Sequence, residues 1–217
     1  MVRSWGIIVW MLVLAVAAAV AMKFAKSEAA VVVGDLRLNE ILAGPARDWD
    51  GDQVFNSRQD EWLEIKNVGA APIDLSPYRV SDADSTIRYE FSGTLAAGAV
   101  LLVTGRQAED WQRSVQRTVT GLSLNNAGDT VILFRINGAD TAAVDTKTYN
   151  SIEGASDRST GRFGTGGDTW ALFDALNKYG GTGEPPSTGC SPTPGAENEC
   201  PTSVINTTWG MIKKEFL

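Results

Sequence analysis

The chain has 217 residues, and 19 lysines and arginines against 26 aspartates and glutamates give it a formal charge of −7. It contains no histidine, which excludes Ser-His-Asp and Cys-His catalytic sets as well as HExxH zinc sites. Its two cysteines cannot complete a four-ligand zinc site. The hydrophobic fraction of 43% and the charged fraction of 21% are ordinary for a globular protein, so one domain with a core is expected.

The first thirty residues form a segment of their own. Arg3 precedes an uncharged, mainly apolar run at residues 5–22, and Lys23 and Lys26 follow it. The length of this run lies at the border between a secretory signal peptide and a membrane-spanning helix. The two lysines favour retention as an N-terminal membrane anchor, whereas the small residues at 17–21 suit cleavage, so both alternatives stay open. Either one predicts an extracytoplasmic protein, secreted or anchored to the membrane.

From residue 36 onward, apolar and polar residues alternate in short segments, which is the pattern of half-buried strands. Turn-forming clusters separate these segments, and Asn137-Gly138 predicts a type I′ hairpin between the last two. A short helix or surface turn is expected at residues 107–115. The pattern indicates an all-β fold, a sandwich or a barrel. Strands are predicted at residues 36–41, 62–66, 78–81, 87–91, 100–104, 130–136 and 141–149.

The C-terminal part of the chain is predicted to be a tethered loop followed by a tail. Residues 180–202 are rich in Gly, Pro, Ser and Thr and show no periodicity. Because export places the chain in an oxidising compartment, Cys190 and Cys200 are predicted to form a disulfide. At residues 208–217, Trp209, Ile212 and Phe216 fall on one face of a short amphipathic helix. This helix could dock on the sandwich, on a partner or on a membrane surface.

Seven short motifs occur in an order that resembles one known family. Read together, they are similar to the lamin tail domain, an immunoglobulin-like β-sandwich found at the end of nuclear lamins and in many exported bacterial proteins. The resemblance spans residues 36–198, so residues 1–30 precede the domain and residues 199–217 form its tail. The motifs are Leu38-Asn39-Glu40-Ile41, the segment 60–67, Ile73-Asp74-Leu75-Ser76 with 78–80, 94–98, 124–131, Val144-Asp145 with Tyr149, and the segment 193–198.

The resemblance implies a binding or attachment module and no catalysis, with an unidentified protein or cell-envelope component as partner. In the second predicted strand, Leu63 and Ile65 should face the core, with Trp62 at an edge. Glu61 and Glu64 could form a catalytic carboxylate pair, but a spacing of three along a strand turns them to opposite faces. A calcium-dependent hydrolase that uses carboxylates alone is the alternative, and it requires two acids that converge in a cleft.

Nucleic-acid binding is a third alternative, which the charge disfavours. Without residues 1–30 the chain keeps 16 basic and 25 acidic residues, a charge of −9, which phosphate backbones repel.

One loop carries residues suited to a metal ion. Asp48, Asp50 and Asp52 alternate along the chain, and calcium prefers six to eight oxygen ligands. In an EF-hand or dockerin-like loop they would take the first, third and fifth positions, with the Val54 carbonyl seventh. The loop departs from that pattern twice, because Gln53 replaces the glycine of the sharp bend and Gln59 replaces the bidentate acid. A solvated acidic turn is the other interpretation. The candidate calcium ligands are Asp48, Asp50, Asp52, Asn56 and Asp60.

Overall fold

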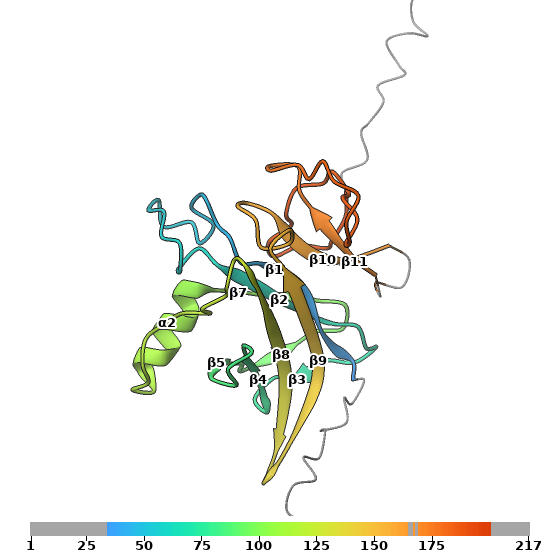
Figure 1. Cartoon of the computed structure of the whole chain (residues 1–217). Coiled ribbons are helices and arrows are strands. Elements are labelled where there is room, and N and C mark those ends of the chain that lie inside the picture. Colours follow the sequence, from blue (N-terminus) through green and yellow to red (C-terminus); the bar gives the residue numbers. More distant parts are fainter. Residues whose placement is uncertain (1–33, 165–166, 168, 201–217) are drawn as a thin grey trace, which may run out of the picture. The chain divides into compact units, whose positions relative to one another are not determined.

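The computed structural model describes residues 34–164, 167 and 169–200. The segment 1–30 and the predicted helix at 208–217 lie outside these ranges, so both stay predictions. Within the described ranges, no helix is long and apolar enough to cross a membrane. The described residues form two main antiparallel β-sheets that stack on each other and one two-stranded sheet, with the helix α2 (Gly105–Ser114) beside them (Figure 1).

The larger sheet has five strands in the order β11-β10-β1-β2-β7. Its central strands β1 and β2 pair through most of their length, from Leu36 opposite Asn67 to Leu42 opposite Trp62. A bulge between Leu38 and Glu40 shifts their register by one residue. The strands are β1 (Leu36–Leu42), β2 (Trp62–Asn67), β7 (Val100–Thr104), β10 (Ser159–Phe163) and β11 (Thr169–Phe173).

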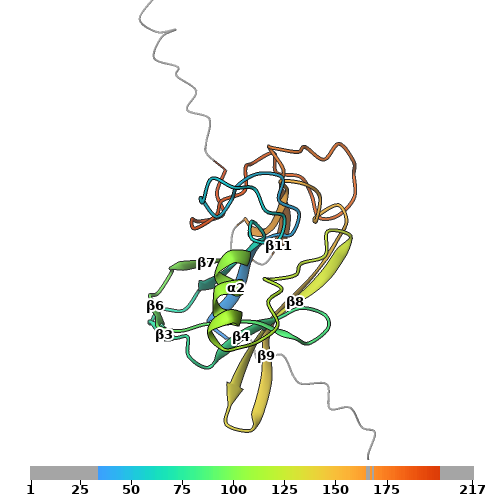
Figure 2. The same ribbon diagram turned by 90° about the vertical axis from the view of Figure 1, so that its left-hand side faces the viewer.

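The smaller sheet has four strands in the order β5-β4-β8-β9, and its long β8–β9 hairpin lies in front of β1 and β2 in Figure 1. Helix α2 packs beside β5 and faces the viewer in Figure 2. A two-stranded sheet of β3 (Ile73–Asp74) and β6 (Thr94–Leu95) adds to the fold. The remaining strands are β4 (Tyr78–Ser81), β5 (Ile87–Glu90), β8 (Gly128–Asn137) and β9 (Asp140–Asn150).

The hydrophobic core lies between the two sheets, where alternate side chains of each strand meet. The five-stranded sheet contributes Leu38, Leu63, Ile65 and Val103, and the four-stranded sheet contributes Val80, Val131, Leu133 and Val144. All eight side chains are buried. The period-two pattern of the sequence therefore marks the inner faces of a β-sandwich, as predicted.

The outer face of the five-stranded sheet is also buried, because residues 174–200 fold back toward it. Asp174 organises the start of this segment: its carboxylate accepts hydrogen bonds from Tyr179 N at 2.8 Å and Gly189 N at 3.0 Å. Cys190 and Cys200 form the predicted disulfide. Residues 180–200 carry no regular strand, as predicted. Backbone hydrogen bonds to β11 and side-chain hydrogen bonds hold the segment on the sheet, and the disulfide closes a loop within it.

All seven predicted strands are present, and α2 begins two residues before the predicted helix. Two details of the sequence prediction were wrong. Trp62 does not pack at an edge, because β2 lies between β1 and β7 and the side chain is fully buried. The β8–β9 hairpin turns at Gly138 and Ala139, and Gly138 has a φ of 63° whereas Asn137 has no positive φ, so the turn is not type I′ around Asn137-Gly138.

Candidate functional site

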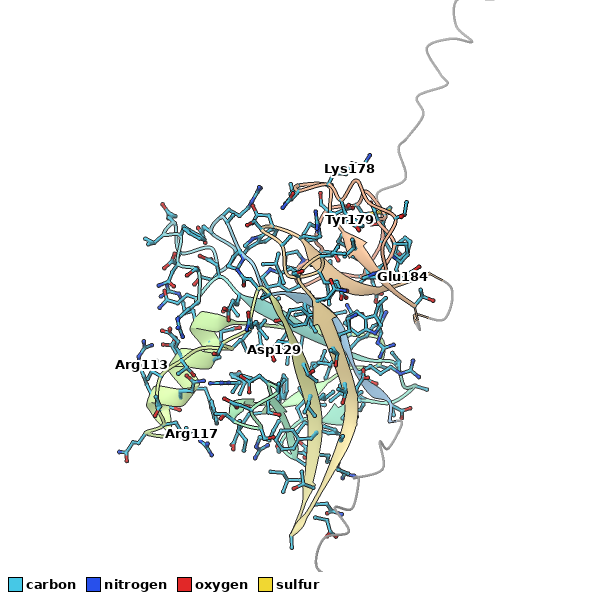
Figure 3. The ribbon with its side chains drawn as sticks, in the orientation of Figure 1. Arg113, Arg117, Asp129, Lys178, Tyr179 and Glu184 are labelled. Carbon is cyan, nitrogen blue, oxygen red and sulfur yellow. A yellow bond between two sulfur atoms is a disulfide. The ribbon has the colours of Figure 1, made fainter. Side chains whose placement is uncertain are left out.

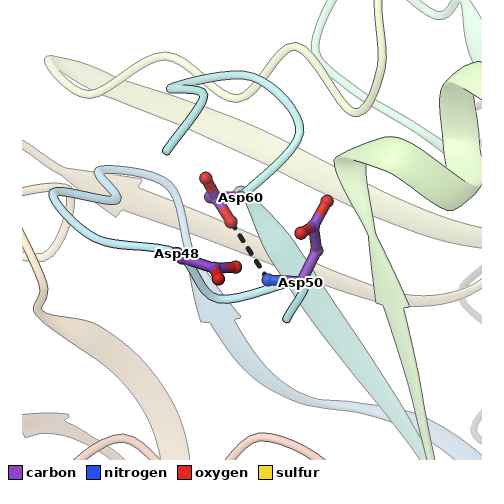
Figure 4. A group of neighbouring side chains, drawn as sticks. All are labelled: Asp48, Asp50 and Asp60. Atoms are coloured by element: carbon purple, nitrogen blue, oxygen red, sulfur yellow. Dashed lines mark hydrogen bonds between the residues drawn. The ribbon is translucent and has the colours of Figure 1, made fainter. Parts of the chain in front are cut away.

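The loop between β1 and β2 is anchored by Asp60, which is completely buried. One oxygen of its carboxylate, Oδ1, accepts hydrogen bonds from Trp49 N at 2.6 Å and Asp50 N at 3.0 Å. The other oxygen, Oδ2, accepts from Asn56 N at 2.7 Å. Since Asp60 lies just before β2, these three bonds tie both halves of the loop to the rigid sheet. Figure 4 shows the bond from Asp50.

The loop bends sharply at Gln53, the position at which the calcium-loop pattern has a glycine. Asp48 accepts hydrogen bonds from Gly51 N and Gln53 N, each at 2.7 Å. Gly51 has a φ of 80°, and Gln53 adopts a φ of 71°, a left-handed conformation that glycine normally supplies. The first departure from the calcium-loop pattern is therefore accommodated by the backbone.

Arg106, in the first turn of α2, reaches across to the same loop. Its Nε donates to Asp50 Oδ2 at 2.6 Å, and its guanidinium also pairs with Asp52. Helix α2 begins here because Thr104 caps it: Thr104 Oγ1 accepts from Gln107 N at 3.2 Å, and the Gln107 side chain accepts from Thr104 N at 2.9 Å. The sequence analysis did not identify Arg106 as part of the loop.

Three of the five predicted ligands come together. One carboxylate oxygen each from Asp48, Asp50 and Asp60 lies within 4.8 Å of the others (Figure 4). Asp52 is engaged by Arg106, and Asn56 Oδ1 accepts from Arg58 N at 3.0 Å. The three grouped acids supply part of the six to eight oxygens that calcium prefers, so the donor set fits a calcium ion whose remaining ligands are backbone carbonyls or water.

Two apolar side chains project from the tip of this loop. Val54 is 62% exposed and Phe55 is 52% exposed, more than the other large hydrophobic side chains of the described residues. An adjacent exposed pair on a loop with a fixed base is a surface suited to contact with a partner. The signal in the sequence is two adjacent apolar residues inside the otherwise polar stretch 50–61.

A second polar cluster lies under the C-terminal segment, on the outer face of the five-stranded sheet. Glu40 and Glu64 are opposite each other on β1 and β2, and both are fully buried. Thr193 Oγ1 donates to Glu40 at 2.5 Å, and the peptide N–H of Gly195 donates to Glu64. The two glutamates thus hold residues 193–195 against the sheet.

The buried glutamates differ from ordinary surface acids in their ionisation. Burial raises the pKa of Glu64 to about 8, although a hydrogen bond from Asn39 Nδ2 at 2.9 Å lowers it. Burial also raises the pKa of Glu40, against the lowering effect of its bonds from Ser159 and Thr193. Asn39 makes a second bond, from Nδ2 to Asn198 Oδ1 at 2.8 Å. The cluster holds residues 193–198 against the five-stranded sheet and leaves little carboxylate surface for a ligand.

Glu61 and Glu64 lie on opposite sides of the five-stranded sheet, as their spacing predicts. Glu64 faces the C-terminal segment, whereas Glu61 Oε2 accepts a hydrogen bond from Leu124 N at 3.1 Å, on the side of the four-stranded sheet. Burial raises the pKa of Glu61 to about 8. The two carboxylates therefore cannot act together on one substrate.

The chain matches a known protein family. A family model described as Lamin Tail Domain matches residues 30–151, which include β1 to β9. No curated protein matches the chain.

Proposed function

Because this chain belongs to the lamin tail domain family, whose members are immunoglobulin-like domains and not typically enzymes, we propose that it is a non-catalytic module that works outside the cytoplasm. It is secreted, or held at the membrane by residues 1–30, and it attaches to a protein or another component of the cell envelope. The disulfide between Cys190 and Cys200 supports this location, because such bonds persist in oxidising compartments.

The observation that carries the proposal is the pair Val54 and Phe55. Both side chains are more than half exposed, while Asp60 and Arg106 fix the base of their loop. An ordered loop loses little conformational entropy when it binds, so an apolar tip on such a loop is a favourable contact surface. Asp48, Asp50 and Asp52 precede the pair in the same loop, which favours a partner surface with an apolar recess rimmed by basic groups.

The test is the binding of the full-length protein to envelope preparations of the source cells. Wild type should bind saturably, and the double variant Val54→Ser/Phe55→Ser should bind at least tenfold more weakly with an unchanged unfolding midpoint. Leu176→Ser is the matched control, because Leu176 is also an exposed hydrophobic residue, at 40%, but lies elsewhere. Equal binding by wild type and the double variant would contradict the proposed surface.

We further propose that calcium stabilises this loop, held by Asp48, Asp50 and Asp60. The close approach of the three acids supports the ion, whereas Arg106 competes for Asp50. Millimolar calcium should raise the melting temperature of wild type, and the triple change of Asp48, Asp50 and Asp52 to Ala should remove that rise. Arg106→Met should enlarge it, because it frees Asp50. An unchanged melting temperature in both wild type and Arg106→Met would refute the calcium site.

The alternative of a carboxylate hydrolase needs acids that are free to react. Glu61, Asp82, Asp84 and Asp129 do line one hollow of the described chain. However, Arg88 pairs with Asp82 and Asp84, and the two oxygens of Asp129 accept peptide N–H groups. Because these acids are already engaged in ion pairs and hydrogen bonds, we favour a binding role for the protein over catalysis. If the wild-type protein hydrolysed a glycan or an ester and Glu61→Gln abolished that activity, the hydrolase would be favoured instead.

A further inference from the structure

Residues 191–199, which we name the flap, form a closed loop against the outer face of the five-stranded sheet. The flap belongs to the orange-red segment beside β10 and β11 in Figure 1. The disulfide joins Cys190 to Cys200, so both ends of the flap meet at one point. That point is fixed to the domain, because Cys190 is buried and its carbonyl oxygen accepts a hydrogen bond from Ala175 N at 2.9 Å. The flap is therefore hinged at one end.

Hydrogen bonds to the sheet hold the flap closed. The hydroxyl and the peptide N–H of Thr193 donate to Glu40 at 2.5 Å and 3.2 Å, and the peptide N–H of Gly195 donates to Glu64. Pro192 is buried, whereas the other flap residues are partly or fully exposed. The buried side chains of the hydrophobic core come from residues 36–149, outside the flap. Because the flap adds little apolar burial, its position depends largely on the two glutamates that accept its hydrogen bonds.

The two acceptors under the flap are carboxyl groups that lie side by side. Glu40 and Glu64 are directly opposite each other on β1 and β2, and both are fully buried. The hydrogen bonds that they accept come from neutral groups of the described residues, namely the hydroxyls of Ser159 and Thr193, the side-chain amide of Asn39 and the peptide N–H groups of Thr193 and Gly195. Neutral donors do not offset two adjacent negative charges as cations would, so the closed flap favours the protonated forms.

The ionisation of the two carboxyls agrees with this geometry. Burial raises the pKa of Glu64 to about 8 against the hydrogen bond from Asn39, and the charge of Glu40 adds to the rise. Burial also raises the pKa of Glu40. When the flap lifts, water reaches both carboxyls and their pKa values fall toward the ordinary value of 4.5. Between pH 4.5 and about pH 8, the closed state therefore keeps protons that the open state releases.

The other charged groups near the pair do not supply the same pH dependence. Lysine, arginine and exposed carboxyl groups change charge outside the range from pH 5.5 to pH 7.5, and the chain has no histidine. Lys66 pairs with Glu197 of the flap, and Arg162 pairs with Asp145 of β9. Glu61, whose pKa burial also raises, lies on the other side of the sheet and stays covered when the flap lifts. The described charged residues on the surrounding strands and on the flap are Arg37, Lys66, Arg162, Glu197 and Glu199.

We propose that the flap is a pH-dependent lid, which closes over the protonated pair Glu40 and Glu64 in acid and is released as the pH rises through neutrality. A lifted flap uncovers the outer face of β1 and β2 with two adjacent carboxylates, so the proton concentration controls access to this face. The lid shares no residue with the surface of Val54 and Phe55 or with the calcium ligands, so it stands or falls independently of the proposed function.

The test is native-state amide hydrogen exchange of the full-length protein, measured by NMR and corrected for the intrinsic exchange rate at each pH. Between pH 5.5 and pH 7.5 the protection of the Gly195 amide should fall about 70-fold from Glu64 alone, because opening releases its proton. The amide of Ile65, in the central strand β2, reports unfolding of the whole domain. Its protection should be stronger and should decrease in dilute urea, whereas that of Gly195 should not respond to dilute urea.

Variants assign the pH dependence to the pair under the flap. The double variant Glu40→Gln/Glu64→Gln keeps an acceptor oxygen at both positions and removes both ionisations, so the protection of Gly195 should no longer depend on pH. The single variant Glu64→Gln should show a weaker dependence than wild type. Glu199→Gln, the same change at an exposed residue of the flap, should behave as wild type. Equal protection and equal urea dependence at Gly195 and Ile65, or no pH-dependent fall at Gly195 in wild type, would overturn the proposal.

Discussion

The buried carboxyl of Glu64 should make the domain lose stability as the pH rises through neutrality. Burial raises the pKa of Glu64 from its ordinary value of 4.5 to about 8 in the folded protein. Between these two values the folded state keeps a proton that the unfolded chain has released. The contribution of the neutral group to stability is therefore complete below pH 4.5 and is lost as the pH rises toward 8.

The size of the effect follows from the difference between the two pKa values. A tenfold change in an ionisation constant is worth about 1.36 kcal/mol, so one such group changes the free energy of unfolding by about 2.5 kcal/mol between pH 5.5 and pH 7.5. Glu64→Gln removes the ionisation and keeps the size of the side chain. The free energy of unfolding of wild type should therefore fall by about 2.5 kcal/mol more than that of the variant over this range.

The assay is urea unfolding at pH 5.5, 6.5 and 7.5, followed by tryptophan fluorescence with the disulfide intact. Glu184→Gln is the matched control, since Glu184 is exposed on the C-terminal segment (Figure 3), and its pH dependence should equal that of wild type. A constant offset between wild type and Glu64→Gln at all three pH values would refute the reasoning, because it would mean that Glu64 is ionised in the folded protein across the range.

Three further changes test the packing that positions the loop and the C-terminal segment. Gly105→Ala should cost roughly 3 kcal/mol in urea unfolding, because the new Cβ would lie 1.8 Å from a backbone carbonyl oxygen of the acidic loop, whereas Gly180→Ala, with open space around it, should be neutral. Gln112→Ala should cost about 3 kcal/mol by the same measurement, since the buried amide donates to two peptide carbonyls and accepts from two N–H groups. Replacement of Cys190 and Cys200 by Ser should lower the free energy of unfolding by about 2.5 kcal/mol, because it removes a ten-residue loop closure. Reduction of the disulfide in wild type should lower the melting temperature by as much as this double replacement does.

Local sequence patterns were sufficient for the elements whose side chains alternate. Leu38, Leu63 and Ile65 face the core as their period-two spacing predicts, and the same spacing correctly separates Glu61 from Glu64. Strands β10 and β11 were not predicted. In β10, Ser159-Thr160-Gly161 shows no alternation of apolar and polar residues, and this strand is fixed by pairing with β1, which lies far away in the sequence. The two-residue strands β3 and β6 are too short for any periodicity to mark them.

For the candidate sites, the sequence determined the chemistry of the groups and the tertiary structure decided which of them meet. The alternating aspartates marked the acidic loop, but only the fold brings Asp60 to Asp48 and Asp50 and sets Arg106, 56 residues away in sequence, against Asp50. The burial of Glu64 depends on residues 193–195 folding back over β2. The physical reason is that alternation along a strand is a local property, whereas burial and charge pairing depend on which distant segments pack together.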